Sequence, residues 1–177
     1  VTLQTALSRM SQFDTARTYA QDALGQEDNT LDSIGNLLTE NLTQKVIAGG
    51  NGAYSDEDRA ALAEELQGIR DNLLDLANTK NSDGRYIFAG YKTDTPPFDD
   101  TGKYVGGDIN VEQQVDSSRS MVIGHTGNLI FDHSTSNAKP DADDNIFTAL
   151  DSAIAALNTP VADADDATKD TVTAAID

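Results

Sequence analysis

The first part of the chain carries apolar side chains spaced mostly three and four residues apart. They are Leu3, Leu7, Met10, Phe13, Ala16, Ala20, Leu24, Leu31, Ile34, Leu38, Leu42 and Val46. This spacing predicts a long helix over residues 2–48 with one apolar face. Gly25 and Gly35 weaken the pattern, and the polar interval between Leu24 and Leu31 is where we expect a kink or a polar surface.

A second helix is predicted to follow a glycine-rich stop at 49–52. Ser55 is a good N-cap, and residues 56–58 place three acids in the first turn, where the helix dipole favours negative charge. The apolar positions then step by four and three, at Leu62, Leu66, Ile69, Leu73 and Leu76. This heptad spacing is typical of helices in antiparallel bundles, so we expect the helix to dock on the C-terminal half of the first.

The stretch that follows has the pattern of a turn and a strand. Asn81–Gly84 is rich in turn-forming residues, and Arg85–Tyr91 alternates β-branched and aromatic residues with others. Pro96 and Pro97 cannot continue a hydrogen-bonded ladder. The sequence therefore predicts a short β-hairpin at the end of the helical region.

The middle of the chain is polar and rich in glycine. Candidate strands lie at Lys103–Val105, Ile109–Val115, Met121–Ile123 and Leu129–Phe131. A third helix, capped by Asp144, is predicted to run to Leu157, and a fourth begins near Ala167.

These elements predict an α+β fold. Its elongated helical-bundle domain contains the long N-terminal helix, antiparallel helices and the short hairpin. We expect this domain to be discontinuous, formed by residues 1–93 and 144–177, with a small, mostly β domain of residues 94–143 inserted between its parts.

The net charge of the chain argues against some classes of binding partner. The net charge is −18, from 12 basic and 30 acidic residues. Such a chain repels nucleic-acid phosphates and anionic lipids, so we expect neither nucleic acid nor a membrane as a partner. No stretch approaches the ~20 apolar residues that span a bilayer. The absence of cysteine excludes disulfides, thiolate metal sites and thiol catalysis.

Catalytic and metal-binding patterns are weak. His125 and His133 lie near Asp132 and Asp141, without the dense ligand spacing of a zinc site, and surface histidines are the plainer interpretation. The run from Asp141 to Asn145 starts like a calcium loop but lacks its glycine and its final glutamate. No nucleophile, phosphate-loop or dinucleotide motif is present. We therefore expect no enzyme activity, catalytic residue, metal or cofactor.

A surplus of apolar helical surface is the positive signal. Leu3, Leu7, Met10 and Leu24 lie on a face that the second helix is too short to cover. The later helices, a further helical segment or a neighbouring subunit could each cover it. Four further side chains are candidates for packing inside the chain or for subunit contacts: Arg85, Tyr86, Phe88 and Tyr91.

Three runs resemble the flagellar hook-associated protein 3 family, whose members are flagellin-like. They are Gly84–Thr93 with Pro97-Phe98, Ser55–Ala60 with Leu66–Asp71, and Gln113–Gly127. The runs follow the family's order and span most of the chain. We expect a core fragment that lacks the terminal helical segments with which such proteins polymerise and that stays monomeric.

The resemblance implies a structural protein of the bacterial flagellum. It would form the junction layer between hook-associated protein 1 and the flagellin filament, as a ring of copies. It would be secreted with the help of an export chaperone and would act outside the cell. Two alternatives remain, a flagellin filament subunit and, in a different class, a calcium-binding or hydrolytic surface module.

Overall fold

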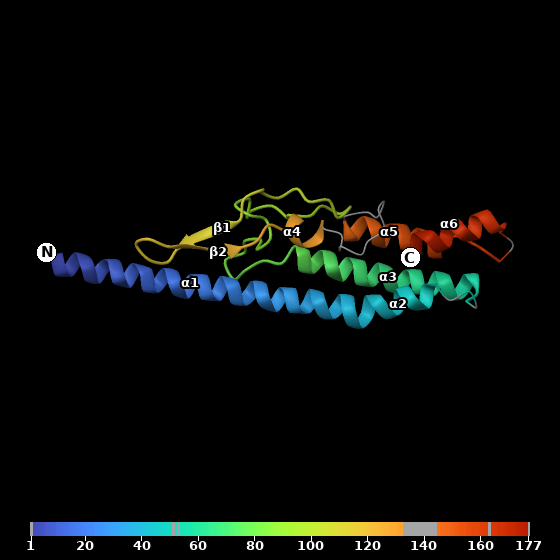
Figure 1. Ribbon diagram of the computed structural model, residues 1–177, viewed down its shortest axis with the longest axis horizontal. Coiled ribbons are helices and arrows are strands. Elements are labelled where there is room, and N and C mark those ends of the chain that lie inside the picture. The colour runs from blue at the N-terminus through green and yellow to red at the C-terminus, as the bar shows by residue number, and fades with distance from the viewer. Residues whose placement is uncertain (1, 51, 53, 133–144, 163, 177) are drawn as a thin grey trace.

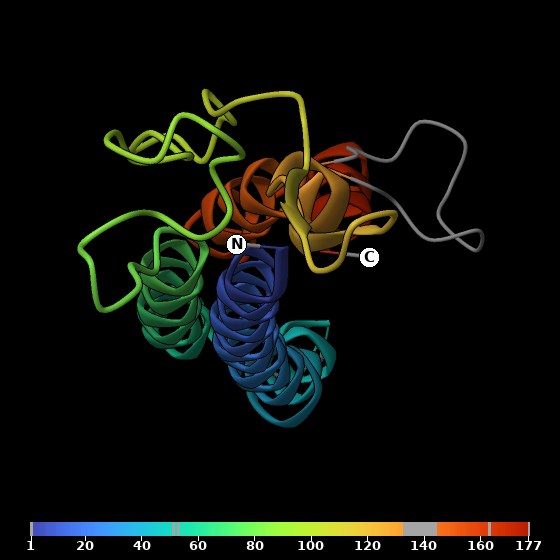
Figure 2. The same cartoon turned by 90° about the vertical axis from the view of Figure 1, so that its left-hand side faces the viewer.

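The computed structural model shows an elongated α+β protein, as the sequence predicts, and describes residues 2–50, 52, 54–132, 145–162 and 164–176. One long helix runs along most of its length (Figure 1). The N-terminus of that helix projects at one end, and the shorter helices gather toward the other. Figure 2 looks along the long axis and shows α1 (Thr2–Asn36) and α3 (Asp56–Ala77) side by side. The two-stranded segment of residues 111–124, which we call the hairpin, and the C-terminal helices lie above them.

The predicted first helix is helical throughout, but its irregular part lies elsewhere than expected. It consists of α1 (Thr2–Asn36), the π-helical segment η1 (Leu37–Leu42) and α2 (Thr43–Gly49). At the C-terminal end of the π segment the Thr43 hydroxyl donates to the carbonyl of Leu38, five residues earlier. The wider turn brings Leu37, Leu38 and Leu42 toward the core. The expected kink between Leu24 and Leu31 was therefore wrong.

Helix α3 (Asp56–Ala77) begins and packs as predicted. The Ser55 hydroxyl accepts from the backbone N–H of Asp58, whose side chain accepts from the Ser55 N–H in return, forming a capping box. Leu62, Leu66 and Leu73 are buried. Helix α5 (Ile146–Leu157) packs along α3, and α6 (Asp166–Ile176) packs on α5.

The cap of α5 lies one residue later than expected. The side chain of Asn145 accepts hydrogen bonds from the N–H groups of Phe147 and Thr148. Asp144, the predicted cap, lies outside the described residues.

The described middle of the chain contains one two-stranded antiparallel sheet. Strand β1 (Val111–Gln114) pairs with β2 (Ser120–Gly124), as the sequence broadly predicts. The strand predicted at Leu129–Phe131 is instead the short helix α4 (Asn128–Phe131), and Lys103–Val105 forms an isolated bridge at Tyr104.

The strand predicted at Arg85–Tyr91 is not formed. Its backbone groups bond to four separate segments: Tyr86 N–H to Thr93, Ile87 N–H to Thr79, Phe88 carbonyl to Gly127 and Ala89 carbonyl to Gly107. Hydrogen bonds that diverge in this way cannot build a ladder. An alternating pattern alone does not reveal this divergence.

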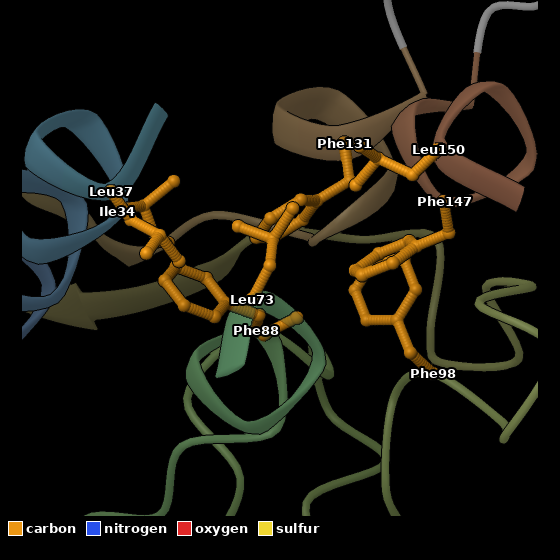
Figure 3. Close-up of a cluster of buried hydrophobic side chains, with 9 residues drawn as sticks. Ile34, Leu37, Leu73, Phe88, Phe98, Phe131, Phe147 and Leu150 are labelled. Carbon is orange, nitrogen blue, oxygen red and sulfur yellow. The ribbon is translucent and has the colours of Figure 1, made fainter. Parts of the chain in front are cut away.

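The main core joins helices to the middle segment (Figure 3). It contains Ile34, Leu37, Leu73, Ala77, Phe88, Phe98, Phe131, Phe147 and Leu150. The rings of Phe98 and Phe131 meet edge to face, with centroids 5.1 Å apart. Above Phe147, the buried Arg70 guanidinium pairs with Asp151, with a shortest distance of 2.6 Å, and ties α3 to α5.

The division into two domains remains a prediction. Phe98 and Phe131 come from the predicted inserted domain, whereas Leu73 and Phe147 come from the predicted helical domain. All four side chains belong to one cluster. Part of the predicted boundary, residues 133–144, lies outside the described chain.

Candidate assembly surfaces

The N-terminal part of α1 projects past the hairpin (Figure 1). Leu3, Leu7 and Met10, which we call the α1 stripe, are 74%, 58% and 63% exposed. Steps of four and three residues place the three side chains on one helix face. Three large apolar side chains in a row, with water on most of their surface, make an exposed apolar patch, which is a candidate for association.

The stripe becomes polar further along the helix. Continuing its spacing leads to Asp14 and Arg17, which pair at 3.1 Å on the surface. Such an exposed pair contributes little stability, typically about 0–1 kcal/mol. The apolar stripe is therefore confined to the first three turns of α1.

Leu24 has different surroundings from the α1 stripe. It is half-buried and lines a groove between α1 and the hairpin, with Arg17, Val115, Arg119 and Met121. The groove has a volume of about 200 Å³. The hairpin thus covers this part of the predicted face and leaves the α1 stripe uncovered.

Of the aromatic candidates, Phe88 differs from the others. Phe88 has no exposed surface and lies in the main core, so it offers nothing to another subunit in this structure. Tyr91 is 59% exposed and Arg85 is exposed, while Tyr86 is half-buried. The ammonium of Lys80 lies 4.9 Å from the centre of the Tyr86 ring, a cation–π contact.

Hydrogen bonds hold the backbone of residues 80–92, which we call the exposed loop because it carries the exposed side chains of Arg85 and Tyr91. Asn81 N–H donates to the Arg85 carbonyl at 2.8 Å, and the Asn81 side chain accepts from the Arg85 N–H. The N–H of Glu112 donates to the hydroxyl of Tyr91 at 3.1 Å. Arg85 and Tyr91 are therefore presented on a backbone that loses little freedom on binding.

One contact of a buried carboxylate was not found from the sequence. The Glu27 carboxylate, 4% exposed, accepts from the His125 N–H at 3.2 Å and lies 2.8 Å from His125 Nδ1. This contact fastens the end of β2 to the polar interval of α1. The hairpin therefore covers Glu27, while Asp28 and Asn29 of the same interval stay exposed, so the expected polar surface is present in part. No local signal could have paired residues 98 positions apart.

Clusters of titratable side chains in the described chain bear on the zinc and calcium sites considered from the sequence. No group of three or more histidine or acidic side chains there could hold a metal ion. Burial raises the pKa of Tyr104 to about 12, with a smaller contribution from Asp108. The hydroxyl of Thr101 is the main cause that lowers the pKa of Asp99. His133 and the Asp141–Asp144 part of the suggested calcium loop lie outside the described residues.

Comparison with known proteins identifies flagellar relatives. Residues 1–93 match the family described as the bacterial flagellin N-terminal helical region. The chain is 52% identical to flagellar hook-associated protein 3 of Escherichia coli (strain K12) and 49% identical to that of Salmonella typhimurium. Both alignments cover 100% of this chain and 57% of the relative.

Solved structures show the same fold. FlgL of Xanthomonas campestris matches with a TM-score of 0.83 at 19% identity, covering 98% of this chain and 84% of that one. A putative flagellar hook-associated protein of Vibrio parahaemolyticus matches at 0.78 and 23%, covering 99% and 79%. The flagellar junction protein FlgL of Legionella pneumophila matches at 0.63 and 32%, covering 74% and 40%. Among the described residues, no helix is long and apolar enough to cross a bilayer.

Proposed function

The chain belongs to the bacterial flagellin family through its N-terminal helical region, and we propose that it is part of the protein that joins the flagellar hook to the filament. In this role it lies between hook-associated protein 1 and flagellin, in a ring with copies of itself. An export chaperone accompanies it until secretion. The names of the relatives support this proposal, since both curated relatives are hook-associated proteins and a solved relative is called a junction protein.

The α1 stripe is the observation that carries the proposal. Burying a leucine or methionine side chain stabilises a contact by about 1.5–3 kcal/mol. In the described chain no other element covers Leu3, Leu7 or Met10, and all three point from one face of a projecting helix. A helix that carries such a face and projects from its fold is suited to lie against another helix, as a structural subunit requires.

The exposed loop supplies a second candidate contact. Arg85 and Tyr91 are of the residue types that dominate protein interfaces, and their backbone is held by internal hydrogen bonds. We place this loop with the α1 stripe in the subunit interface, together with the accessible part of Tyr86. Leu24 joins them at the edge of the hairpin groove, and Phe88 remains in the core.

A complementation experiment tests this role. The whole gene product containing this chain is expressed in a strain that lacks its own hook-associated protein 3, and attached filaments are counted by electron microscopy. We expect the unsubstituted protein to restore filaments. Replacing Leu3, Leu7 and Met10 by serine is expected to reduce attachment at least tenfold, because three buried apolar contacts are lost.

The matched control replaces three other exposed apolar residues by serine: Ile47, Val105 and Ile109. We expect this variant to attach filaments normally, and both variants to be secreted. Equal loss in both would show that the α1 stripe has no special role. Restoration of filaments in a strain that lacks flagellin, and not in one that lacks the junction protein, would favour a filament subunit instead.

A further inference from the structure

The π-helical segment η1 interrupts the long helix formed by α1, η1 and α2, and a π turn holds more residues than an α turn. At its end the backbone N–H of Thr43 donates to the Leu38 carbonyl, five residues earlier. An α-helix would use the carbonyl four residues earlier. The Thr43 hydroxyl donates to the same Leu38 carbonyl at 2.9 Å, and the Thr39 hydroxyl donates to the Gly35 carbonyl at 2.8 Å. The segment is therefore a turn with its own hydrogen bonds.

The buried positions on the two sides of η1 do not fit one regular helix. Leu37 and Gly49 are both buried and lie 12 residues apart. Twelve residues of α-helix make about 3.3 turns, which would place the two positions about 120° apart around the helix axis. Ile34 is buried and Val46 packs on a second cluster that includes Leu62, and these two residues have the same spacing. A helix without η1 would therefore turn the two members of each pair in different directions.

The neighbouring helix α3 is a regular α-helix throughout. Its buried residues Leu62 and Leu73 are 11 residues apart, which is about three turns, so both lie on one face of α3. Leu73 belongs to the main core with Leu37 (Figure 3). A Cβ placed on Gly49 would lie 3.2 Å from the Leu62 side chain, so these two positions are also close together. Between the same two contacts, α3 has 11 residues and the long helix has 12.

We propose that η1 is a register adapter, a turn that takes up the one residue by which the long helix exceeds α3 between these contacts. With that residue in the π turn, Leu37 and Gly49 are spaced like 11 residues of α-helix and differ by about 20° around the axis. Residues 39–41 of the segment are exposed, so the extra residue lies on the side that faces water.

The adapter also sets the direction in which the α1 stripe faces. If α2 stayed packed through Gly49 and the helix had no π turn, α1 would be rotated by about 100° about its axis. Glu27 would then leave His125, and the α1 stripe would face another side of the molecule. The importance of this direction for assembly rests on the proposed function.

Deletion of single residues tests the adapter, at two exposed acids of the long helix. Deletion of Glu40 removes the extra residue, so the helix can close into regular turns while both contacts with α3 stay in place. We expect a melting temperature within about 2 °C of that of the unaltered chain, or above it.

The control is deletion of Asp32, which precedes the main-core residues of the same helix. Either Ile34 and Leu37 then leave the main core, or all of α1 before them turns and Glu27 leaves His125. We expect the melting temperature to fall by at least about 5 °C, because buried contacts are lost in both cases.

Amide hydrogen exchange shows which contacts survive each deletion. The N–H of His125 donates to Glu27, so its exchange reports the docking of α1 on β2, and the N–H of Leu73 reports the main core. Both should exchange as before when Glu40 is deleted, and at least one should exchange faster when Asp32 is deleted. A fall of more than about 2 °C after deletion of Glu40, or faster exchange at either amide, would overturn the adapter.

The direction of the α1 stripe is tested in the complementation experiment described above. Attached filaments should stay near normal after deletion of Glu40 and fall at least fivefold after deletion of Asp32. Loss of filaments by a protein that lacks Glu40 and keeps its melting temperature and exchange would overturn the inferred direction of the stripe. Failure of the unaltered protein would instead contradict the junction role, while melting and exchange still decide the adapter.

Discussion

Two regions of α1 and its continuation follow the same apolar spacing and have opposite surroundings. In the packed region, Ile34 and Leu37 are buried against α3 and the aromatic cluster. In the projecting region, Leu3 and Leu7 are mostly exposed. Spacing therefore identifies which face of a helix is apolar, but it does not say what covers that face. In this protein the packed region contributes to the core, and the projecting region exposes the apolar surface that we propose for assembly.

Replacing a leucine by alanine should change the free energy of unfolding far more at a buried position than in the projecting region, and this is the largest difference we expect. Leu73→Ala removes a fully buried side chain of α3 and should lower the free energy of unfolding by about 2–5 kcal/mol, through lost burial and a new cavity. Leu7→Ala, at a mostly exposed position of α1, should change it by less than about 0.5 kcal/mol. Urea unfolding followed by circular dichroism measures both. A cost above that limit for Leu7→Ala would mean that the α1 stripe is covered.

Substitutions at two glycines can distinguish the cost of backbone strain from the cost of crowding. Gly102 has φ of 81°, and a Cβ there would lie 2.2 Å from the Cβ of Phe147. Gly102→Ala should cost about 2–5 kcal/mol, from left-handed strain and overpacking together. Gly84 has φ of 76° with open space around it, so Gly84→Ala should cost about 1–2 kcal/mol. Thermal unfolding measures both, and equal losses would show that Phe147 yields freely.

The hairpin lies between the two regions, and its attachment can be weakened selectively. Glu27→Gln keeps the side-chain shape and removes the charge that faces His125, which should cost about 1.5–3 kcal/mol. Amide hydrogen exchange should accelerate at residues 121–123 of β2. Exchange in α3 should stay unchanged. The control Asp28→Asn alters an exposed neighbour on α1, and similar acceleration there would argue against the Glu27–His125 contact.

Local signals account for what could be predicted. The capping box of α3 involves Ser55 and Asp58, which are three residues apart, so the sequence displays it directly. The helical content, the antiparallel packing of α3 and the β1–β2 pair follow from periodicity and turn residues. The π segment does not, because it depends on how Leu37 and Leu42 reach the core. The strand predicted at Arg85–Tyr91 was wrong for the same reason, because the hydrogen-bond partners of its backbone are set by the fold and lie in separate segments.

Exposure of the candidate interface residues also could not be predicted from local sequence alone. Leu3, Leu7 and Met10 were predicted from spacing, and the structure leaves them exposed. Phe88 has the same aromatic character as Tyr91, yet only the fold reveals that Phe88 is buried. Subunit contacts of these residues remain predictions.

Alkaline pH should lower the free energy of unfolding by less than the substitutions described above. Burial raises the pKa of Tyr104 to about 12. The stabilisation that depends on its protonated hydroxyl is therefore fully present below pH 10 and is lost as the pH rises toward 12. The side chain is partly exposed and screened by water, so we expect a loss of about 1 kcal/mol. Tyr104→Phe should flatten this decline, measured by urea unfolding between pH 8 and pH 12. Tyr19→Phe, in α1, is the control and should leave it in place.

The smallest expected effect concerns a glycine of α1 just beyond the projecting region. Gly25 is exposed, and a Cβ there would meet nothing within 4 Å. Gly25→Ala should stabilise the protein by about 0.5–1 kcal/mol, because alanine loses less backbone freedom on forming a helix. Gly68→Ala offers the same test in α3, where the surroundings are also open.

Thermal unfolding and amide exchange in residues 10–24 check the prediction. Both variants should be stabilised alike, and exchange before Gly25 should slow only in Gly25→Ala. Stabilisation by Gly68→Ala together with destabilisation by Gly25→Ala would show that another surface already rests on that side of α1. The projecting region of α1 would then be covered by another molecule in solution, and its exposure in the single chain would not describe the protein in solution.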